Sequence, residues 1–325
     1  MLLESGIVLS SFVAIVAGTA LPNYRRHGTT TTDLTDSSYD VVDIYSLHLV
    51  ADRSDVDTDD LEDNEDTPDV DPELDLPSPD IDAIMSVDDS EFANYTYETG
   101  GLVRSDVGLS NSTREVSAQD VPWTCRKKAH KTNGDKVKGR GLKITNGDSV
   151  KRGFYIYQNS CDAVPYKYIW IPAGKTRFVQ LPKMFEGRIV RGSNKWNLHG
   201  TPRLLGSWLE FSFDEHNVIW GDVSLIRGTD GAIAVWSTDA QKRRHKGFRN
   251  WILDGAPKKA YTKKPSGAKV IRPTEGKNAV INKVPRDYIM RKVGAKKVYV
   301  DDSHAKPVIN SQNGRFGVWF GRGRI

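Results

Sequence analysis

The sequence predicts a mainly β protein, an antiparallel β-sandwich in residues 121–325 that is preceded by a disordered acidic arm. In the second part of the chain, short segments rich in β-branched and aromatic residues follow one another between turn-forming pairs such as Asn-Gly and Asp-Gly. Charge divides the 325 residues at the same place: residues 27–120 carry 26 acidic and 3 basic side chains, and residues 121–325 carry 15 acidic and 41 basic ones. Net charges of −23 and +26 exclude two similar globular halves.

Ten short strands are expected in the basic part, at a spacing typical of a sandwich or barrel. They are Leu142–Thr145, Phe154–Gln158, Tyr166–Ile171, Arg177–Leu181, Gly187–Val190, Trp208–Phe213, Val218–Ile226, Ala232–Ser237, Lys296–Val300 and Phe316–Phe320. Along 208–213 the side chains alternate, so Trp208 and Glu210 share one face and Leu209 and Phe211 the other. Helical periodicity is scarce in this part of the chain.

Residues 1–20 are predicted to be a secretory signal peptide. The apolar run 6–18 is shorter than the roughly 20 residues that a membrane-spanning helix needs, and small residues such as Gly18 and Ala20 suit cleavage. A positive start is missing, since Glu4 is the only charge before the run, and the alternative is a buried N-terminal helix or strand. The prediction places the protein outside the cell.

Residues 21–120 form the acidic arm, which is expected to be disordered because high net charge and few apolar residues cannot offset the entropy of ordering. Only Val41–Val50 gathers enough aliphatic residues for a weak strand or helix. Two glycosylation sequons begin at Asn94 and Asn111, and a secreted protein exposes such sites.

The arm has two possible roles. Its charge opposes that of the basic domain, so as a tethered pro-segment it could screen a basic surface until it is removed or displaced. The pair Arg25-Arg26 and the run Arg126–Lys128 are candidate processing sites. The alternative is a solubilising linker without a switching role.

Cys125 and Cys161 are the only cysteines of the chain. In a secreted protein they most simply form a disulfide, which closes a loop of about 35 residues and stabilises the fold by about 3–4 kcal/mol. No CxxC motif or Cys/His cluster is present in the sequence, so we expect neither a zinc site nor a cofactor.

The run from Phe154 to about Ala232 resembles the thaumatin-like (osmotin) family, in particular its short, cysteine-poor fungal secreted members. The matching segments occur in the order of that family and cover about 80 of the 325 residues. They are the strand with Asn159-Ser-Cys161, the turn Ile171-Pro-Ala-Gly174, the segment Phe185–Arg191, the string Trp208-Leu-Glu-Phe211, and Gly221-Asp-Val-Ser-Leu-Ile-Arg-Gly228, which is the most specific.

The resemblance implies a β-sandwich-like domain with a cleft that some members use to bind β-glucans. Carried over residue by residue, the cleft would contain Arg188, Glu210 and Asp222. Such carboxylates accept hydrogen bonds from vicinal sugar hydroxyls, and the rings of Trp208 or Trp220 could stack on pyranose rings as an aromatic platform.

This chain departs from the family's pattern at two positions. Arg227 stands where the family has its second Asp, which replaces an acceptor by a fixed cation. The family's later Asp has no clear counterpart, although Asp230 or Asp254 could substitute. Glu210 and Asp222 also have a purely structural interpretation, as ion-pair partners of Arg188 or Arg191 within the sheet.

The last third of the chain suggests other chemistry. Lysine and arginine recur from Gln241 to Lys297 among aromatic residues, a pattern that fits either a polyanion-binding surface or a solvated basic face. Asp301, Asp302 and His304 form the only compact acid/His cluster of the basic part; a metal or acid–base site and a capped turn are both open.

From these patterns we expect a secreted, monomeric, non-enzymatic protein that binds carbohydrate, in particular β-glucan, or a host or cell surface, in an antifungal or effector-like role. The alternative is a toxin-like protein that binds anionic surfaces (lipid, RNA or acidic polysaccharide) and is masked by its own arm. An enzyme at this site would be a glycoside hydrolase that uses Glu210 and an Asp, with carboxyl groups about 5 Å or 6.5–9.5 Å apart.

Overall fold

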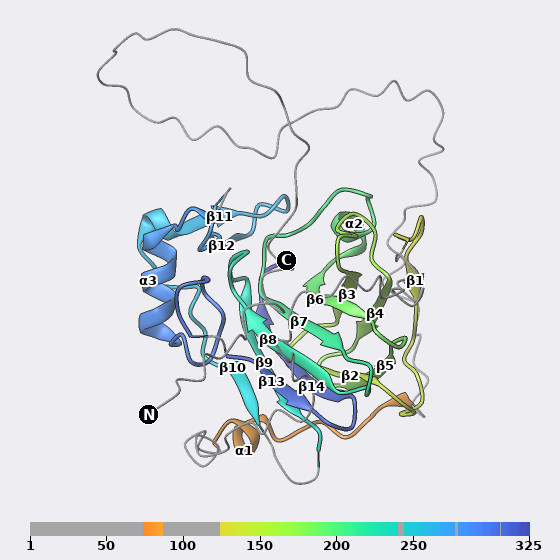
Figure 1. Ribbon diagram of the computed structural model, residues 1–325. Coiled ribbons are helices and arrows are strands. Elements are labelled where there is room, and N and C mark those ends of the chain that lie inside the picture. The colour runs from red at the N-terminus through yellow and green to blue at the C-terminus, as the bar shows by residue number, and fades with distance from the viewer. Residues whose placement is uncertain (1–73, 87–123, 240–243, 277–278, 306) are drawn as a thin grey trace, which may run out of the picture. The chain divides into compact units, whose positions relative to one another are not determined.

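The computed structural model describes residues 74–86, 124–239, 244–276, 279–305 and 307–325, all of which belong to one compact unit. The predictions of a signal peptide, of a strand or helix at Val41–Val50, of glycosylation at Asn94 and Asn111, and of processing at Arg25-Arg26 lie outside these residues. The described part is mostly β, as the sequence predicts, and contains three sheets (Figure 1).

The largest sheet has seven strands and carries most of the segments named above. Its order is β1 (His130–Lys131), β4 (Lys167–Ile171), β3 (Arg152–Gln158), β6 (Glu186–Gly192), β7 (Trp208–Phe213), β8 (Ile219–Ser224) and β13 (Ile309–Ser311). All neighbours pair antiparallel except β1 and β4, which pair parallel.

The second sheet has five strands in the order β10 (His245–Phe248), β9 (Gly231–Ser237), β14 (Arg315–Gly323), β2 (Gly141–Asn146) and β5 (Thr176–Gln180). The C-terminal strand β14 enters between β9 and β2 and pairs parallel with β2. Both large sheets are therefore mixed, which corrects the prediction of a purely antiparallel arrangement. A parallel pair requires a distant segment to return to the sheet, and local strand patterns do not report such a return.

The two large sheets share one hydrophobic core. Inward-facing residues of β3, β6, β7 and β8 meet those of β2, β9 and β14, and most of them are fully buried. Phe154 of β3 and Phe320 of β14 bring their ring centroids within 5.0 Å of each other. The alternation predicted for 208–213 is confirmed, since Leu209, Phe211 and Phe213 lie in this core.

A lobe of short elements adjoins the sheets and contains the 3-10 helix η3 (Lys258–Ala260), the hairpin β11 (Tyr261–Lys263) with β12 (Lys269–Ile271), and the helix α3 (Lys283–Lys292). The hydroxyl of Tyr288 ties α3 to the segment before η3, since its single proton lies between the carbonyl oxygens of Ile252 and Asp254, at 2.9 and 3.1 Å. Two further short helices are α1 (Ile81–Ser86) and α2 (Asn194–Asn197). None of the helices described is long and apolar enough to span a membrane.

The segment Lys296–Val300 is not a regular strand, although the sequence predicts one. Only Tyr299 pairs with the sheet, through a parallel bridge to Ser224 at the end of β8. Its N–H donates to Val223 and its carbonyl accepts from Leu225, at 2.7 and 2.9 Å. This single bridge matters for the site because it brings the residues after 298 next to β8.

Candidate functional site

Three adjacent strands place Arg188, Glu210 and Asp222 in one row across the seven-stranded sheet. Arg188 on β6 lies directly opposite Glu210 on β7, and Glu210 lies opposite Asp222 on β8. Directly opposite residues of an antiparallel pair have β-carbons about 4.5–5.5 Å apart. Trp208 and Trp220 lie two residues from Glu210 and Asp222 along the same strands, hence on the same side of the sheet. We call Arg188, Trp208, Glu210 and Asp222 the carboxylate face.

The two carboxyl groups of this face hold their protons far more strongly than carboxyls in water. Burial raises the pKa of Glu210 to about 7, although the guanidinium groups of Arg188 and Arg227 and a hydrogen bond from Ser224 act in the opposite direction. The pKa of Asp222 is raised by burial and further by the neighbouring charge of Glu210. The pair therefore shares protons near neutral pH and can both donate and accept hydrogen bonds.

Arg188 is buried, with 4% of its surface exposed, and its guanidinium lies between two aromatic rings. Its central carbon is 4.7 Å from the ring centroid of Tyr157 and 4.4 Å from that of Trp208. Its Nη1 forms an ion pair with Asp162 Oδ1 at 2.6 Å. The acidic partner of Arg188 is thus a loop residue, and no ion pair among the described residues joins Glu210 or Asp222 to Arg188 or Arg191.

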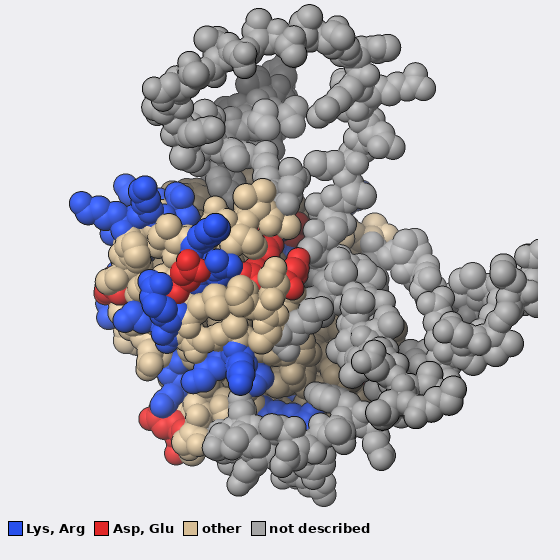
Figure 2. All heavy atoms as spheres, turned by 60° about the vertical axis from the view of Figure 1, so that its left-hand side comes forward, with Lys and Arg blue, Asp and Glu red and all other residues tan. Residues whose placement is uncertain are grey.

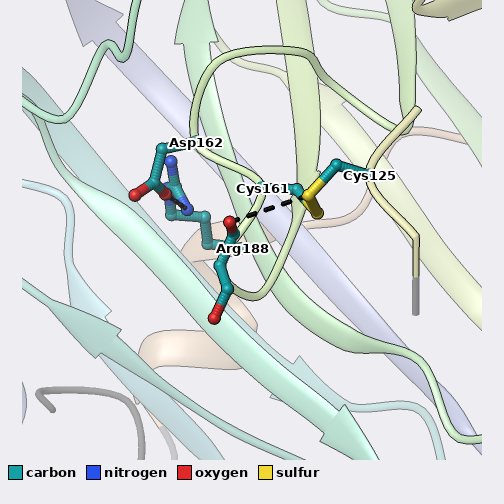
Figure 3. The surroundings of a disulfide bond; sticks show 5 residues. Cys125, Cys161, Asp162 and Arg188 are labelled. Atoms are coloured by element: carbon teal, nitrogen blue, oxygen red, sulfur yellow. Dashed lines mark hydrogen bonds and ion pairs between the residues drawn. A yellow bond between two sulfur atoms is a disulfide. The ribbon is translucent and has the colours of Figure 1, made fainter. Parts of the chain in front are cut away.

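The predicted disulfide between Cys125 and Cys161 is present and supports this arrangement. Cys161 immediately precedes Asp162, so the bond holds the loop that presents the carboxylate to Arg188 (Figure 3). The cysteines are 36 residues apart in sequence, and closing a loop of that length stabilises a fold by about 4 kcal/mol in the chain-entropy model. The disulfide therefore helps to position Asp162, the ion-pair partner of Arg188 in the carboxylate face.

The disulfide predicts the outcome of processing at Arg126–Lys128, whose residues are exposed. Cys125 precedes this run, so cleavage there leaves the whole N-terminal arm covalently attached to Cys161. After limited trypsin digestion, a product cut at this run should migrate as one species on a non-reducing gel and as two with reductant. A Cys125→Ser/Cys161→Ser variant should give two bands in both lanes, and separation of the wild type without reductant would contradict the pairing.

Several polar atoms of the carboxylate face lack a partner within the protein. Arg188 Nε and Nη2, Trp208 Nε1 and Asp222 Oδ1 are buried and make no hydrogen bond to any described residue. A buried polar atom left unpaired costs about 1–3 kcal/mol, so native structures rarely tolerate several of them together. This concentration of unused donors and acceptors marks the face as a place where a polar ligand or ordered water completes the structure.

Trp208 and Trp220, predicted to form an aromatic platform, do not present open ring faces for stacking. Trp208 is 6% exposed, and the Arg188 guanidinium covers one face of its ring. Trp220 is half-buried and donates its Nε1 proton to Asp214 Oδ2 at 3.1 Å. Within the described structure, Trp208 therefore offers its indole N–H rather than a bare ring.

Three residues were named where the chain departs from the resemblance, and only Arg227 acts on the carboxylate face. Arg227 is half-buried, and its positive charge opposes the rise in the pKa of both Glu210 and Glu275. Asp230 is buried in an ion-pair network, 3.2 Å from Arg191 Nε and 2.7 Å from Lys264 Nζ. Asp254 is exposed and pairs with Arg324 at 2.8 Å.

A second acidic group, formed by Asp302 and Glu275, adjoins the face; the sequence had singled out Asp302 only together with Asp301 and His304. Tyr299 donates its hydroxyl proton to Asp302 Oδ1 at 2.6 Å, and its pKa is raised by burial, by Asp302 and also by Asp222. Burial and the nearby Asp302 raise the pKa of Glu275, whose Oε1 accepts from the N–H of Asp302. The bridge between Tyr299 and Ser224 and the hydrogen bond from the N–H of Thr274 to the carbonyl oxygen of Ile226, at 3.0 Å, bring this group next to β8.

The neighbouring Asp301 and His304 serve the turn rather than the face. Asp301 is fully buried; its Oδ1 is 2.6 Å from His304 Nδ1 and its Oδ2 is 3.2 Å from Arg286 Nη1. Its Oδ1 also accepts from the N–H of Ser303, as a capping carboxylate does. No group of three or more His, Cys, Asp or Glu side chains among the described residues is arranged to hold a metal ion.

Comparison of the chain with protein-family models gives no match, and comparison with the sequences of curated proteins gives none either. The interpretation of the face therefore depends on its own geometry and on the segments quoted above.

Proposed function

We propose that the protein is a secreted, non-enzymatic carbohydrate-binding protein with a thaumatin-like domain and that the carboxylate face holds an uncharged polysaccharide such as a β-glucan. The observation that carries this proposal is the row of Arg188, Glu210 and Asp222 on adjacent strands, in which Glu210 is half-buried and several neighbouring polar atoms have no partner among the described residues. They supply donors and an acceptor at adjacent positions of one sheet, and a sugar presents hydroxyls that both donate and accept.

The charge of the face supports an uncharged ligand. Arg188 and Arg227 supply positive charge, whereas Glu210 and Asp222 retain protons because burial disfavours their ionised forms. A carboxyl pair that is partly protonated donates to one hydroxyl and accepts from the next, which suits vicinal diols. A cationic ligand would meet the guanidinium groups of Arg188 and Arg227, and an anionic ligand would meet Asp162, which already pairs with Arg188.

Glu210→Gln is expected to weaken binding to insoluble β-1,3-glucan by about 10-fold or more, because an amide cannot accept at both oxygens and the loss of a hydrogen bond involving a charged group costs about 1.5–3 kcal/mol. The measurement is sedimentation of the protein with the glucan at pH 8, above the Glu210 pKa of about 7, where this carboxyl is mostly ionised. Glu215→Gln is the matched control, since that side chain is 77% exposed and lies beside His216.

Two outcomes would change the proposal. Undiminished sedimentation of the Glu210→Gln protein would remove the carboxylate face as the glucan site. Release of reducing sugar by the wild type that Glu210→Gln abolishes would mean that the paired carboxyls act as the acid and base of a glycoside hydrolase. Both are read from the same incubation.

A second candidate function rests on the basic lobe, defined as Lys258, Lys259, Lys263, Lys283, Arg291, Lys292, Lys296 and Lys297. All eight side chains are exposed, and none forms an ion pair with any other described residue. Figure 2 shows lysine and arginine side chains gathered on this side of the molecule, where α3 and the β11–β12 hairpin lie, with few acidic ones among them. Such a surface attracts an anionic membrane at low salt.

Deleting residues 21–73, which carry 16 acidic and 3 basic side chains, should strengthen binding to phosphatidylserine vesicles if the arm masks the lobe. In that background, Lys258→Ala/Lys259→Ala/Lys263→Ala is expected to lower the partition coefficient by about 100-fold, since each lysine near an anionic surface contributes about 1 kcal/mol. The control removes the same charge elsewhere, with Lys127→Ala/Lys128→Ala/Lys183→Ala. Equal losses in the two triple variants, or no vesicle binding by the deletion protein at low salt, would exclude this function.

A further inference from the structure

Residues 74–86 belong to the acidic arm in sequence but lie against the five-stranded sheet. We call this segment the strap; it contains Asp75, Asp80 and Asp82 and no basic residue. Figure 1 shows it in orange, running from the side of β2 and β5 toward β10 and ending in α1. It therefore reaches both edge strands of the sheet, β5 and β10.

The extended half of the strap adds to the edge of β5. Leu76 forms an antiparallel bridge with Thr176 and donates its N–H to the carbonyl oxygen of Thr176 at 3.0 Å. Pro77 and Pro79 have no N–H, so the backbone ladder stops after this bond. The Ser78 hydroxyl donates to the carbonyl of Gly174. An edge strand has free backbone groups that accept such a segment, and here most of the selectivity comes from side chains.

The main side-chain contact is a charge pair that is largely buried. Asp75 Oδ1 lies 2.6 Å from Arg177 Nε, and Asp75 Oδ2 lies 3.4 Å from Lys175 Nζ. Arg177 is 2% exposed and donates from Nη1 to the carbonyl of Asn133 at 2.7 Å. Within the described ranges, Asp75 is the one carboxylate that pairs with Arg177. The sheet edge thus holds a buried cation whose partner comes from the arm.

The helical half of the strap makes the remaining contacts. Asp80 caps α1, since its Oδ1 accepts from the N–H of Ala83 at 3.0 Å. In the helix that follows this cap, Ile84 is buried, with 6% of its surface exposed. Asp82 forms an ion pair with Arg249, just beyond the end of β10. The edge of the sheet therefore recognises an aspartate (Asp75), the residue after it that pairs with β5 (Leu76), and an aliphatic side chain eight positions after Leu76 (Ile84).

We propose that this edge of the sheet is a docking site for an extended acidic peptide of another protein and that the strap occupies it in cis as a displaceable internal ligand. Residues 87–123 tether the strap to Thr124 through 37 residues, and a tether of that kind gives an effective concentration in the millimolar range. If the strap sequence itself binds the free site with a Kd of about 10 µM, a competing peptide binds the occupied site about 100-fold more weakly than the free one. A partner must therefore match the strap's pattern closely or arrive at high local concentration.

The test compares full-length proteins with a fluorescent synthetic peptide of residues 72–88. Asp75→Asn/Leu76→Pro removes the carboxylate and the paired N–H of the strap, and we expect this variant to bind the peptide about 100-fold more tightly than the wild type does. Binding should weaken with salt, and a peptide carrying Asp75→Asn should bind poorly. Asp69→Asn, the same charge change in the arm outside the strap, should behave as the wild type. Equal affinity of the variant and the wild type, or no binding to either, overturns the proposal.

Hydrogen exchange of the wild-type protein gives a second reading that does not depend on how the variant folds. The Leu76 amide should be protected, and millimolar unlabelled peptide should speed its exchange several-fold by displacing the strap. A protected amide whose exchange is unaffected by the peptide would make the strap a permanent part of the sheet and would refute displacement.

Discussion

Replacing Asp230 with asparagine is expected to lower the free energy of unfolding by about 3–5 kcal/mol, because it leaves a buried guanidinium without its anion. The Arg191 side chain is 1% exposed, with Asp230 as its carboxylate partner and the carbonyl oxygens of Gly321 and Ala232 as further acceptors. Burial alone would raise the pKa of Asp230, but Lys264 and Arg191 outweigh it and the pKa is lowered. Chemical denaturation at pH 7 measures the loss.

The matched control for this change is Asp254→Asn. Asp254 also pairs with an arginine, Arg324, but its side chain is 67% exposed, and exposed ion pairs contribute about 0–1 kcal/mol. Similar losses in the two variants would mean that Asp230 is not the anchor of this network. The comparison also separates two interpretations, since a ligand-binding Asp230 would reduce glucan binding without a large loss of stability.

Nine of the twelve strands of the two large sheets could be predicted because their signal is local, whereas the short strands β1, β10 and β13 were not expected. Alternating polarity and β-branched residues specify segments such as Trp208–Phe213, whose bounds agree with the structure. Helix α3 was not predicted. Only Pro285, Tyr288 and Ile289 of this helix are buried, so its apolar stripe is narrow and much of its remaining surface is charged. A proline in the first turn of a helix is tolerated, although it lowers the helical signal of the sequence.

The residues of the candidate site were expected only from the quoted segments of the resemblance. The register places Arg188, Glu210 and Asp222 opposite one another, and their role in ligand binding stays a prediction. Asp302 and Glu275 could not be assigned to it, because their position depends on contacts between residues far apart in sequence, such as the bridge between Tyr299 and Ser224, 75 residues apart. The docking of residues 74–86 was equally hidden, since the composition of the surrounding arm predicts disorder.

Glu210→Gln is expected to stabilise the protein at pH 8 by up to about 3 kcal/mol while weakening glucan binding. The pKa of Glu210 is about 7 in the folded protein and 4.5 in the unfolded chain. Between these values the folded state binds more protons than the unfolded state, so the unfolding free energy of the wild type falls as the pH rises. Below about pH 4.5 both states are protonated and the group contributes nothing; above about pH 7 the penalty of a buried charge is complete.

A glutamine at position 210 removes this pH-dependent penalty and also the repulsion that raises the pKa of Asp222. The stability curve of the variant should therefore be flatter between pH 5 and 8 and should meet that of the wild type near pH 4. Glu215→Gln, at an exposed position, should leave the slope unchanged. An identical slope in wild type and Glu210→Gln would place the proton uptake elsewhere. A more stable fold combined with weaker ligand binding is expected of a binding residue that is kept at the expense of stability. A carboxyl that served the fold through an ion pair would instead lose stability when it is replaced.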